Sequence, residues 1–204
     1  MNAVPYIALL LWITLFAVPF SAVAAPGAPD NAEKIALPPP NKTGGKPLMQ
    51  TLSLRASNRN IQEAAISQQD LGNLLWAAWG MNRADGHRTV PTARNMQAVL
   101  LYVALADGVW LYDGAQHSLL KVLDEDVRAR FANAPVTLIY TAEEGPYAGM
   151  HVGSMYQNVG LYCASAGLAN VVKATGRDVL ANRLPLPPQY SILIIQLLGK
   201  PADR

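Results

Sequence analysis

Apolar residues recur at the spacing of an amphipathic helix in two long stretches of the chain. In the first, Ser67 and Asp70 form a capping-box-like start, and Gly80 closes a stripe at positions i, i+3, i+4, i+7 and i+8. In the second, from about Tyr147 to Ala166, similar spacing continues until Gly167. The pattern predicts two core-facing helices, the second being the longer. Their apolar stripes are Leu71, Leu74, Leu75, Ala78 and Trp79, and then Val152, Met155, Val159, Tyr162, Cys163 and Ala166.

Shorter apolar runs between turn residues predict the strands of a sheet. Residues 98–105 and 109–112 flank the turn Ala106-Asp107-Gly108, which is typical of a hairpin. Helices and strands follow one another without regular βαβ alternation, and no glycine-rich dinucleotide fingerprint occurs. The chain is therefore expected to be an α+β domain with helices flanking a mainly antiparallel central sheet. We also expect an edge strand over 117–123, buried strands over 135–141 and 190–198, and short helices beginning at Pro47, over 124–131 with Asp124 as its cap, and over 177–184.

The N-terminal part differs from the rest of the chain. Tyr6 to Val18 is almost wholly apolar and precedes Ala22-Val23-Ala24, a small-x-small cleavage pattern. This predicts a signal peptide over 1–25, a Pro/Gly-rich tether over 26–46 and one domain over 47–204, with a periplasmic or secreted location after cleavage. The n-region contains no Lys or Arg, so an uncleaved membrane anchor is the alternative, and membrane contact is expected only in that case.

Composition and charge exclude several classes of function. The 204 residues are 51% hydrophobic and 15% charged, which suits one domain with a substantial core. A net charge of +2, without a basic run, gives no reason to expect a nucleic-acid partner. The single cysteine, Cys163, is expected to be a buried structural thiol. His87, His117 and His151 are isolated and predict no metal site.

The polar stretch 88–97 lies between the first predicted helix and the hairpin. Pro91 prevents the helix from continuing, and Thr92 can cap a short turn after it. Asn95 and Gln97 offer donors and acceptors that suit the edge of a planar heterocycle. An ordinary capping loop is the alternative, and Arg88 could pair with an acidic neighbour instead of contacting a ligand.

A second polar motif, Arg55-Ala56-Ser57-Asn58-Arg59, follows the helix predicted to begin at Pro47. A bend there could place Arg55, Ser57 and Arg59 around one phosphate, since guanidinium groups supply charge and bidentate geometry. A pair of solvated arginines is the alternative.

Together the two motifs resemble those of the nitroreductase family of FMN-dependent oxidoreductases. The family order is Arg-x-Ser-x-Arg/Lys followed by Pro-Ser/Thr-x-x-Asn-x-Gln. The resemblance continues through 76–83, 157–161 and 166–168, and covers about residues 47 to 201.

The resemblance implies a site for FMN, which would carry hydride or electrons to or from a small organic substrate. Arg55, Ser57 and Arg59 would hold its phosphate and ribityl chain. Pro91 and Thr92 would line the flavin, and Asn95 would bond its pyrimidine side. The loop from Lys173 to Gly176 would offer backbone amides near the reactive nitrogen, with Lys200 and Arg204 as further phosphate contacts. Because the cofactor performs the chemistry, no catalytic side chain is expected.

The resemblance also implies a homodimer with FMN at the interface. Larger nitroreductases insert a helical segment where residues 124–146 leave room for one short helix, so a more open pocket is expected. An exported protein is not expected to meet a nicotinamide pool, which predicts weak NAD(P)H oxidation. Two other classes are an exported FMN-binding protein without turnover and a structural envelope protein that binds no flavin.

Overall fold

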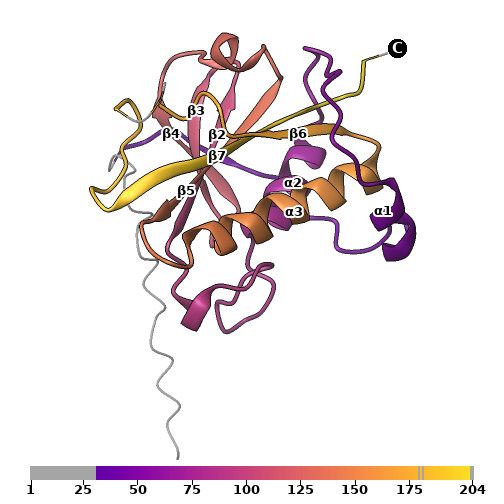
Figure 1. Cartoon of the computed structure of the whole chain (residues 1–204), viewed down its shortest axis with the longest axis horizontal. Coiled ribbons are helices and arrows are strands. Elements are labelled where there is room, and N and C mark those ends of the chain that lie inside the picture. Colours follow the sequence, from indigo (N-terminus) through magenta and orange to yellow (C-terminus); the bar gives the residue numbers. More distant parts are fainter. Residues whose placement is uncertain (1–30, 179, 181, 203–204) are drawn as a thin grey trace, which may run out of the picture.

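The computed structural model describes residues 31–178, 180 and 182–202, which build a seven-stranded antiparallel sheet (Figure 1). The strand order is β1-β4-β3-β2-β5-β7-β6, and each neighbouring pair is antiparallel. This confirms the predicted fold class. The strands are β1 (Lys34–Ala36), β2 (Val99–Leu105), β3 (Gly108–Asp113), β4 (Ser118–Leu123), β5 (Val136–Glu143), β6 (Ala169–Lys173) and β7 (Tyr190–Gly199).

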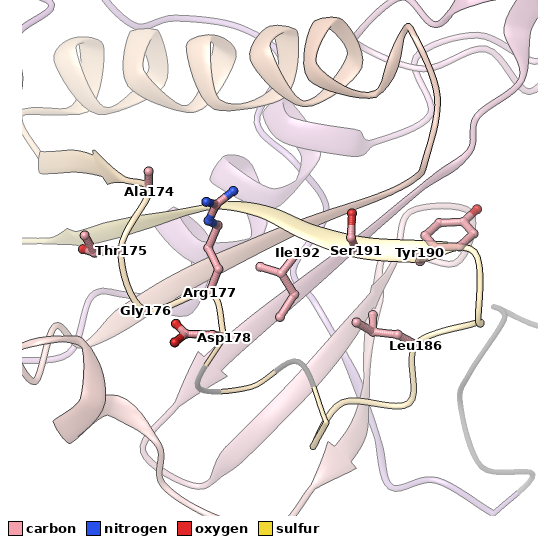
Figure 2. Close-up of a pocket in the computed structure, with 9 residues that line it drawn as sticks. All are labelled: Ala174, Thr175, Gly176, Arg177, Asp178, Leu186, Tyr190, Ser191 and Ile192. Atoms are coloured by element: carbon pink, nitrogen blue, oxygen red, sulfur yellow. The ribbon is translucent and has the colours of Figure 1, made fainter.

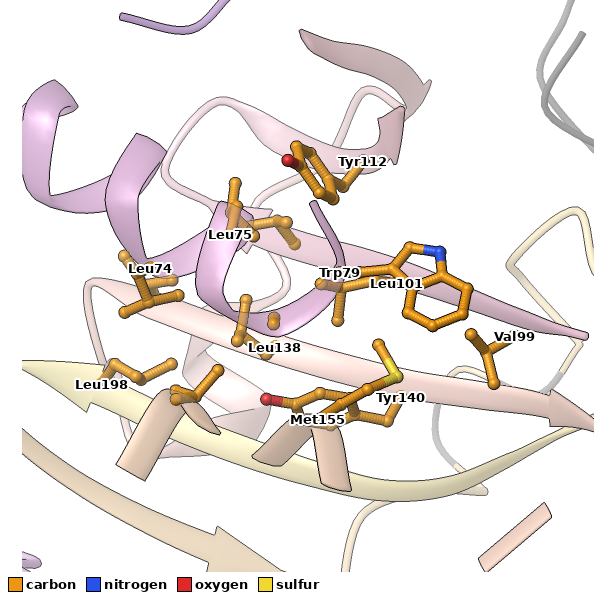
Figure 3. Close-up of a cluster of buried hydrophobic side chains, with 14 of the residues drawn as sticks. Leu74, Leu75, Trp79, Val99, Leu101, Tyr112, Leu138, Tyr140, Met155 and Leu198 are labelled. Atoms are coloured by element: carbon orange, nitrogen blue, oxygen red, sulfur yellow. The ribbon is translucent and has the colours of Figure 1, made fainter. Parts of the chain in front are cut away.

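Two helices cover one face of this sheet. They are α2 (Gln68–Trp79) and α3 (Ala148–Ala166). Leu74 and Trp79 of α2 and Met155 of α3 join Leu101 and Tyr140 of the sheet in one cluster of buried side chains (Figure 3). The opposite face is covered by irregular segments, from which Phe131, Leu180 and Leu184 contribute to a second cluster. Both faces are therefore buried, which explains why the central strands are almost continuously apolar.

The ends of the predicted long helices are confirmed. Ser67 caps α2, its Oγ accepting a hydrogen bond of 3.0 Å from the Asp70 amide. Gly80 follows the last residue of α2. Gly167 ends α3 with φ of 74°, a left-handed conformation that glycine adopts without steric cost. The short helix α1 (Leu48–Leu54) begins directly after Pro47, as predicted.

The segment predicted to be a tether contributes one strand. β1 pairs with β4, so the strand expected at the edge of the sheet, over 117–123, is an inner one. Leu37 is buried, and the Pro38 carbonyl lies 2.9 Å from His117 Nε2. A strand of three residues is too short to show a hydrophobic period, so it escaped sequence analysis.

Two predicted helices are absent from the described residues. Over 124–131 the helical part is a 3-10 turn, η2 (Arg128–Phe131), which follows Val127 and not a cap on Asp124. Over 177–184 the described residues form bends and turns. Their apolar residues face the sheet through irregular backbone, which sequence spacing alone does not distinguish from a short helix. β6 was not predicted, because it has only five residues and the sequence shows no boundary between them and the loop that follows Lys173.

Across residues 31–178, 180 and 182–202, no helix combines the length and apolarity needed to cross a membrane. The predicted signal peptide and the candidate Arg204 lie outside the described residues.

Candidate functional site

The arginine motif leaves the end of α1 and runs beside β6. Arg55 is the C-cap of α1, and the Asn58 amide donates to the Asn170 carbonyl at 2.8 Å. The side-chain stem of Arg55 reaches Gly160 in the C-terminal half of α3, 3.9 Å from where a β-carbon would stand. The backbone of the motif is thus fixed, whereas Arg55, Ser57 and Arg59 are exposed to solvent.

The last strand returns the chain to the same place. The Gln62 amide donates to the Lys200 carbonyl, and the Ala202 amide donates to the Asn60 carbonyl, both at 2.9 Å. This pairing brings Lys200 beside the segment that contains Arg59. Among the described residues, Arg55, Arg59 and Lys200 form no ion pair with a carboxylate. Their charges are therefore available to an anion.

The loop after β6 forms one wall of a cavity of about 600 Å³ (Figure 2). β6 pairs with residues 195–199 of β7, so no strand of the described residues pairs with the first five residues of β7 on that side. The cavity lies beside this open edge. Gly176 has φ of 86°, and Arg177 Nη1 donates to the Leu193 carbonyl at 3.0 Å. The residues that line the cavity are Ala174, Thr175, Gly176, Arg177, Asp178, Leu186, Tyr190, Ser191 and Ile192.

The loop from Lys173 to Gly176, which the resemblance implied, contributes Gly176 to this wall, whereas Arg177 and the residues at the start of β7 were not among the predicted site residues. No signal in the sequence pointed to them, because β6, whose end leaves the start of β7 without a paired strand, was itself not predicted. The predicted Lys173 is the last residue of β6 and lies opposite Ile195.

The proline motif forms a tight turn before β2. Pro91 is exposed, and Thr92 precedes the 3-10 turn η1 (Ala93–Asn95). Thr92 stands at the N-cap position of η1, as expected, but its side chain makes no capping hydrogen bond. Its Oγ1 instead accepts from the backbone N–H of Gln97 at 3.2 Å. Asn95 is exposed and has φ of 54°. A non-glycine residue in this region costs on the order of 1 kcal/mol or more, which the turn's other contacts offset.

Gln97 and Arg88 hold this turn from within. Gln97 Oε1 accepts from Arg88 Nε at 2.6 Å, and Gln97 Nε2 donates to the Gly86 carbonyl and to Asn95 Oδ1. Gln97 is therefore engaged inside the protein, contrary to its predicted availability for a heterocycle. The pairing considered for Arg88 is also wrong, since no carboxylate of the described residues forms an ion pair with it. Arg88 instead stacks on the Trp79 ring at 4.5 Å.

Two titratable side chains of α3 are buried. His151 Nε2 accepts a hydrogen bond of 2.8 Å from the Ala93 amide, and burial lowers the pKa of the imidazole. Sequence analysis considered His151 only as a possible metal ligand and predicted no metal site there. Burial raises the pKa of the Cys163 thiol to about 12, which agrees with the predicted structural role. No group of three His, Cys, Asp or Glu side chains in the described part of the chain could hold a metal ion.

The two motifs lie at different levels of α3. The proline turn contacts His151, whereas Arg55 contacts Gly160, nine residues further along the helix. At 1.5 Å per residue, this spacing corresponds to about 14 Å. One chain therefore presents the arginine motif with Lys200 at one position and Pro91, Thr92 and Asn95 at another.

An antiparallel sheet with two helices on one face and two polar motifs along the longer helix is the arrangement of an α+β ligand-binding domain. The family model that matches it is that of the nitroreductase family, over residues 52–200, and the chain belongs to this family. A protein of Methanocaldococcus jannaschii assigned to the nitroreductases is 30% identical over 175 residues, covering 72% of this chain and 88% of its own.

Two solved structures extend this comparison. A protein of Ralstonia eutropha JMP134 assigned to the nitroreductases is 33% identical, with a TM-score of 0.78 over 88% of this chain and 94% of its own. A nitroreductase-like protein of Desulfovibrio desulfuricans, crystallised in complex with FMN, is 19% identical, with a TM-score of 0.57 over 78% of this chain and 89% of its own. At that identity the second likeness concerns the fold alone.

Proposed function

We propose that the protein is an FMN-dependent oxidoreductase that transfers hydride or electrons to or from a small organic substrate. The observation that supports this most is the pairing of residues 60–62 with 200–202, which brings Lys200, distant in the sequence, beside the segment that contains Arg59. Arg55, Arg59 and Lys200 have no acidic partner among the described residues. Membership of the nitroreductase family and the FMN held by the Desulfovibrio relative support the choice of cofactor.

The phosphate of FMN fits the arginine motif. A phosphate monoester carries nearly two negative charges at neutral pH and accepts hydrogen bonds on three oxygens. Arg55 and Arg59 would supply charge and bidentate donors, Ser57 a hydroxyl and Lys200 a further charge. Because the backbone of this segment is pinned to Asn170 and Lys200, little of it has to be ordered on binding.

The flavin ring would lie beside the loop from Lys173 to Gly176, part of which lines the cavity beside β7. From Lys200 the chain runs back along β7 to Ile195, opposite Lys173, a distance of about 17 Å at 3.3 to 3.4 Å per residue. FMN bound there would supply the two-electron chemistry, and the chain would bind and orient it. Backbone amides of the loop from Lys173 to Gly176 would face the side of the ring where charge develops on reduction. Pro91, Thr92 and Asn95 would line and bond the ring from the other motif.

A homodimer would bring the two motifs to one FMN. Large apolar side chains are exposed on α1 and beside the N-terminal end of α3, at both levels where the motifs lie. Met49 is 75% exposed and Met150 is 54% exposed. Such patches commonly mark protein–protein contacts. A second copy covering this surface would place its own proline turn near the arginine motif of the first. The exposed apolar residues are Leu48, Met49, Leu52, Leu54, Met96, Tyr147 and Met150.

The structure between β4 and α3 supports an open flavin pocket. The described chain there has only the four-residue η2 and β5, and no helix long enough to cover a ring. If residues 1–25 direct export, as we propose, the flavin would exchange electrons with an envelope substrate and acceptor in place of NAD(P)H.

An acceptor screen tests whether the bound flavin turns over. Reduced protein is mixed anaerobically with quinones and nitroaromatic compounds, with free reduced FMN as the control. A saturable reoxidation rate that depends on the acceptor is expected for an oxidoreductase. Reoxidation slower than that of free FMN with every acceptor would instead indicate an FMN-binding protein without turnover.

A further inference from the structure

The turn from Thr92 to Gln97 holds a backbone conformation that residues with side chains rarely adopt. Arg94, Asn95 and Gln97 have φ of 52°, 54° and 51°, in the left-handed region that favours glycine. Such conformations persist only where surrounding contacts hold them, and they cluster at ligand sites. The contacts that hold this turn therefore control how Thr92 and Asn95 are presented to a ligand.

One of these contacts comes from α3. The Ala93 amide donates to His151 Nε2 at 2.8 Å, and Ala93 immediately precedes the first left-handed residue. A backbone amide can only donate, so this ring nitrogen must offer its lone pair. The bond exists only while the imidazole is neutral.

The surroundings of His151 favour the neutral form. The residue is 3% exposed and is the fourth residue of α3, where the partial positive charge of the helix end disfavours an imidazolium. The Tyr147 ring stacks on the imidazole of His151, with 6.3 Å between the ring centroids. Charged groups face the same pocket of about 240 Å³ from two elements, Arg94 from the turn and Glu143 and Glu144 from the end of β5. Neither carboxylate forms an ion pair with His151.

We propose that His151 is a positioning residue of the flavin site, which holds Ala93 and thereby sets the conformation in which Thr92 and Asn95 meet the FMN ring. This rests on the function proposed above. Protonation removes the acceptor and sets a cation against the Ala93 N–H group, so the turn is released. Because the bonded turn requires the neutral ring, FMN affinity is fully present above the ordinary histidine pKa of about 6.5 and is lost as the pH falls through the lower pKa of the buried imidazole.

The deciding experiment is a titration of the full-length protein with FMN between pH 8 and pH 5.5, on the wild type, His151→Gln and His151→Ala. A glutamine oxygen can accept the Ala93 hydrogen bond but does not titrate. At pH 8 we expect His151→Gln to bind like the wild type and His151→Ala to bind about 5- to 10-fold more weakly.

Acidification should separate the wild type from His151→Gln. The FMN phosphate itself loses charge near pH 6, which weakens binding in every variant alike. The wild type should lose about 5- to 10-fold more affinity than His151→Gln over the same range. Parallel pH curves for these two proteins would overturn the proposal, and this comparison also stands if His151→Ala does not fold.

A second measurement needs no flavin and separates failure of this inference from failure of the proposed function. Hydrogen exchange of the Ala93 amide should show a protection factor at pH 8 that falls at pH 5.5 in the wild type and persists in His151→Gln. A protection factor that does not change with pH in the wild type would refute the role of His151. If protection behaves as expected but no variant binds FMN at any pH, the proposed function fails and the contact remains.

Discussion

At the scale of single residues, the arginine motif combines a fixed backbone with exposed side chains. The backbone around Arg59 is fixed by the hydrogen bond from Asn58 to Asn170 and by the pairing of residues 60–62 with 200–202. No described side chain binds the Arg59 guanidinium. An anion that binds there would therefore gain direct contacts without breaking an existing ion pair.

Replacing Arg59 with Ala should weaken FMN binding by about 1.5 to 3 kcal/mol, or roughly 10- to 150-fold in Kd, because a charge-assisted phosphate bond is lost. Fluorescence titration with FMN measures the change. Lys34→Ala, at the opposite edge of the sheet, removes the same charge from the protein and should leave Kd unchanged. Equal Kd values for Arg59→Ala and the wild type would remove Arg59 from the site.

Cys163 permits a prediction about the core of α3. The thiolate is the reactive form, and with its pKa raised to about 12 by burial the side chain is almost wholly protonated at pH 8. A thiol reagent should therefore label the native protein only at the rate of unfolding, and label it at once in denaturant. Rapid labelling of the native protein at pH 8 would show that this part of α3 opens readily.

The sequence predicted part of the candidate site. The two motifs are local, so the resemblance to the nitroreductase family could name their residues, and the structure places Lys200 beside the segment that contains Arg59. The hydrogen bond between Ala93 and His151 and the position of Tyr190 in the cavity wall could not be foreseen, because each depends on segments far apart in the chain. Gln97 shows the opposite error, since its amide has the right chemistry for a ligand but is already bonded to Arg88.

At the scale of elements, strong periodicity and clear end signals made α2 and α3 predictable. Both helices have glycine at their C-terminal ends and apolar stripes of more than two turns. β1, β6 and η2 have three to five residues each, which is too short for a pattern, and tertiary packing decides their conformation.

A glycine within α3 and the glycine that ends it should respond oppositely to alanine. Gly167→Ala places a β-carbon at φ of 74° and should destabilise the protein by about 1 kcal/mol, although no atom obstructs it. Gly153→Ala, within the helix and with only ordinary contacts to Tyr156, should stabilise it by about 0.5 to 1 kcal/mol. Urea unfolding of the flavin-free protein measures both. A stabilised Gly167→Ala variant would contradict the assigned helix end.

At the scale of the whole molecule, the apolar side chains of α1 are exposed, and a partner surface that covers them would explain why they are apolar. Four of its seven residues are leucines or methionines that are at least 44% exposed, including its last residue, Leu54. Burial of such a surface against a second copy is a common solution in symmetric dimers.

Light scattering should therefore report a dimer, and Leu52→Glu should shift it towards a monomer that binds FMN less tightly. A charge at this apolar contact would have to be desolvated without a partner. Gln116→Glu, in the exposed turn between β3 and β4, adds the same charge and should leave the dimer intact. A wild-type monomer with FMN fully bound would refute the shared site.

The proposed export predicts that NADH and NADPH are poor electron donors for the bound flavin. Stopped-flow mixing with NADH or NADPH should reduce the bound flavin slowly and without saturation at micromolar concentrations. Fast, saturable bleaching would indicate an ordinary nitroreductase and would remove the reason for proposing an envelope electron partner.

The most direct test of the whole account is whether the protein holds FMN. The purified protein, mixed with excess FMN and passed through a desalting column, should retain one FMN per chain, visible as the flavin absorption spectrum and released on denaturation. Protein that shows no flavin absorbance, even after refolding in excess FMN, would contradict the assignment of Arg55, Arg59 and Lys200 to its phosphate.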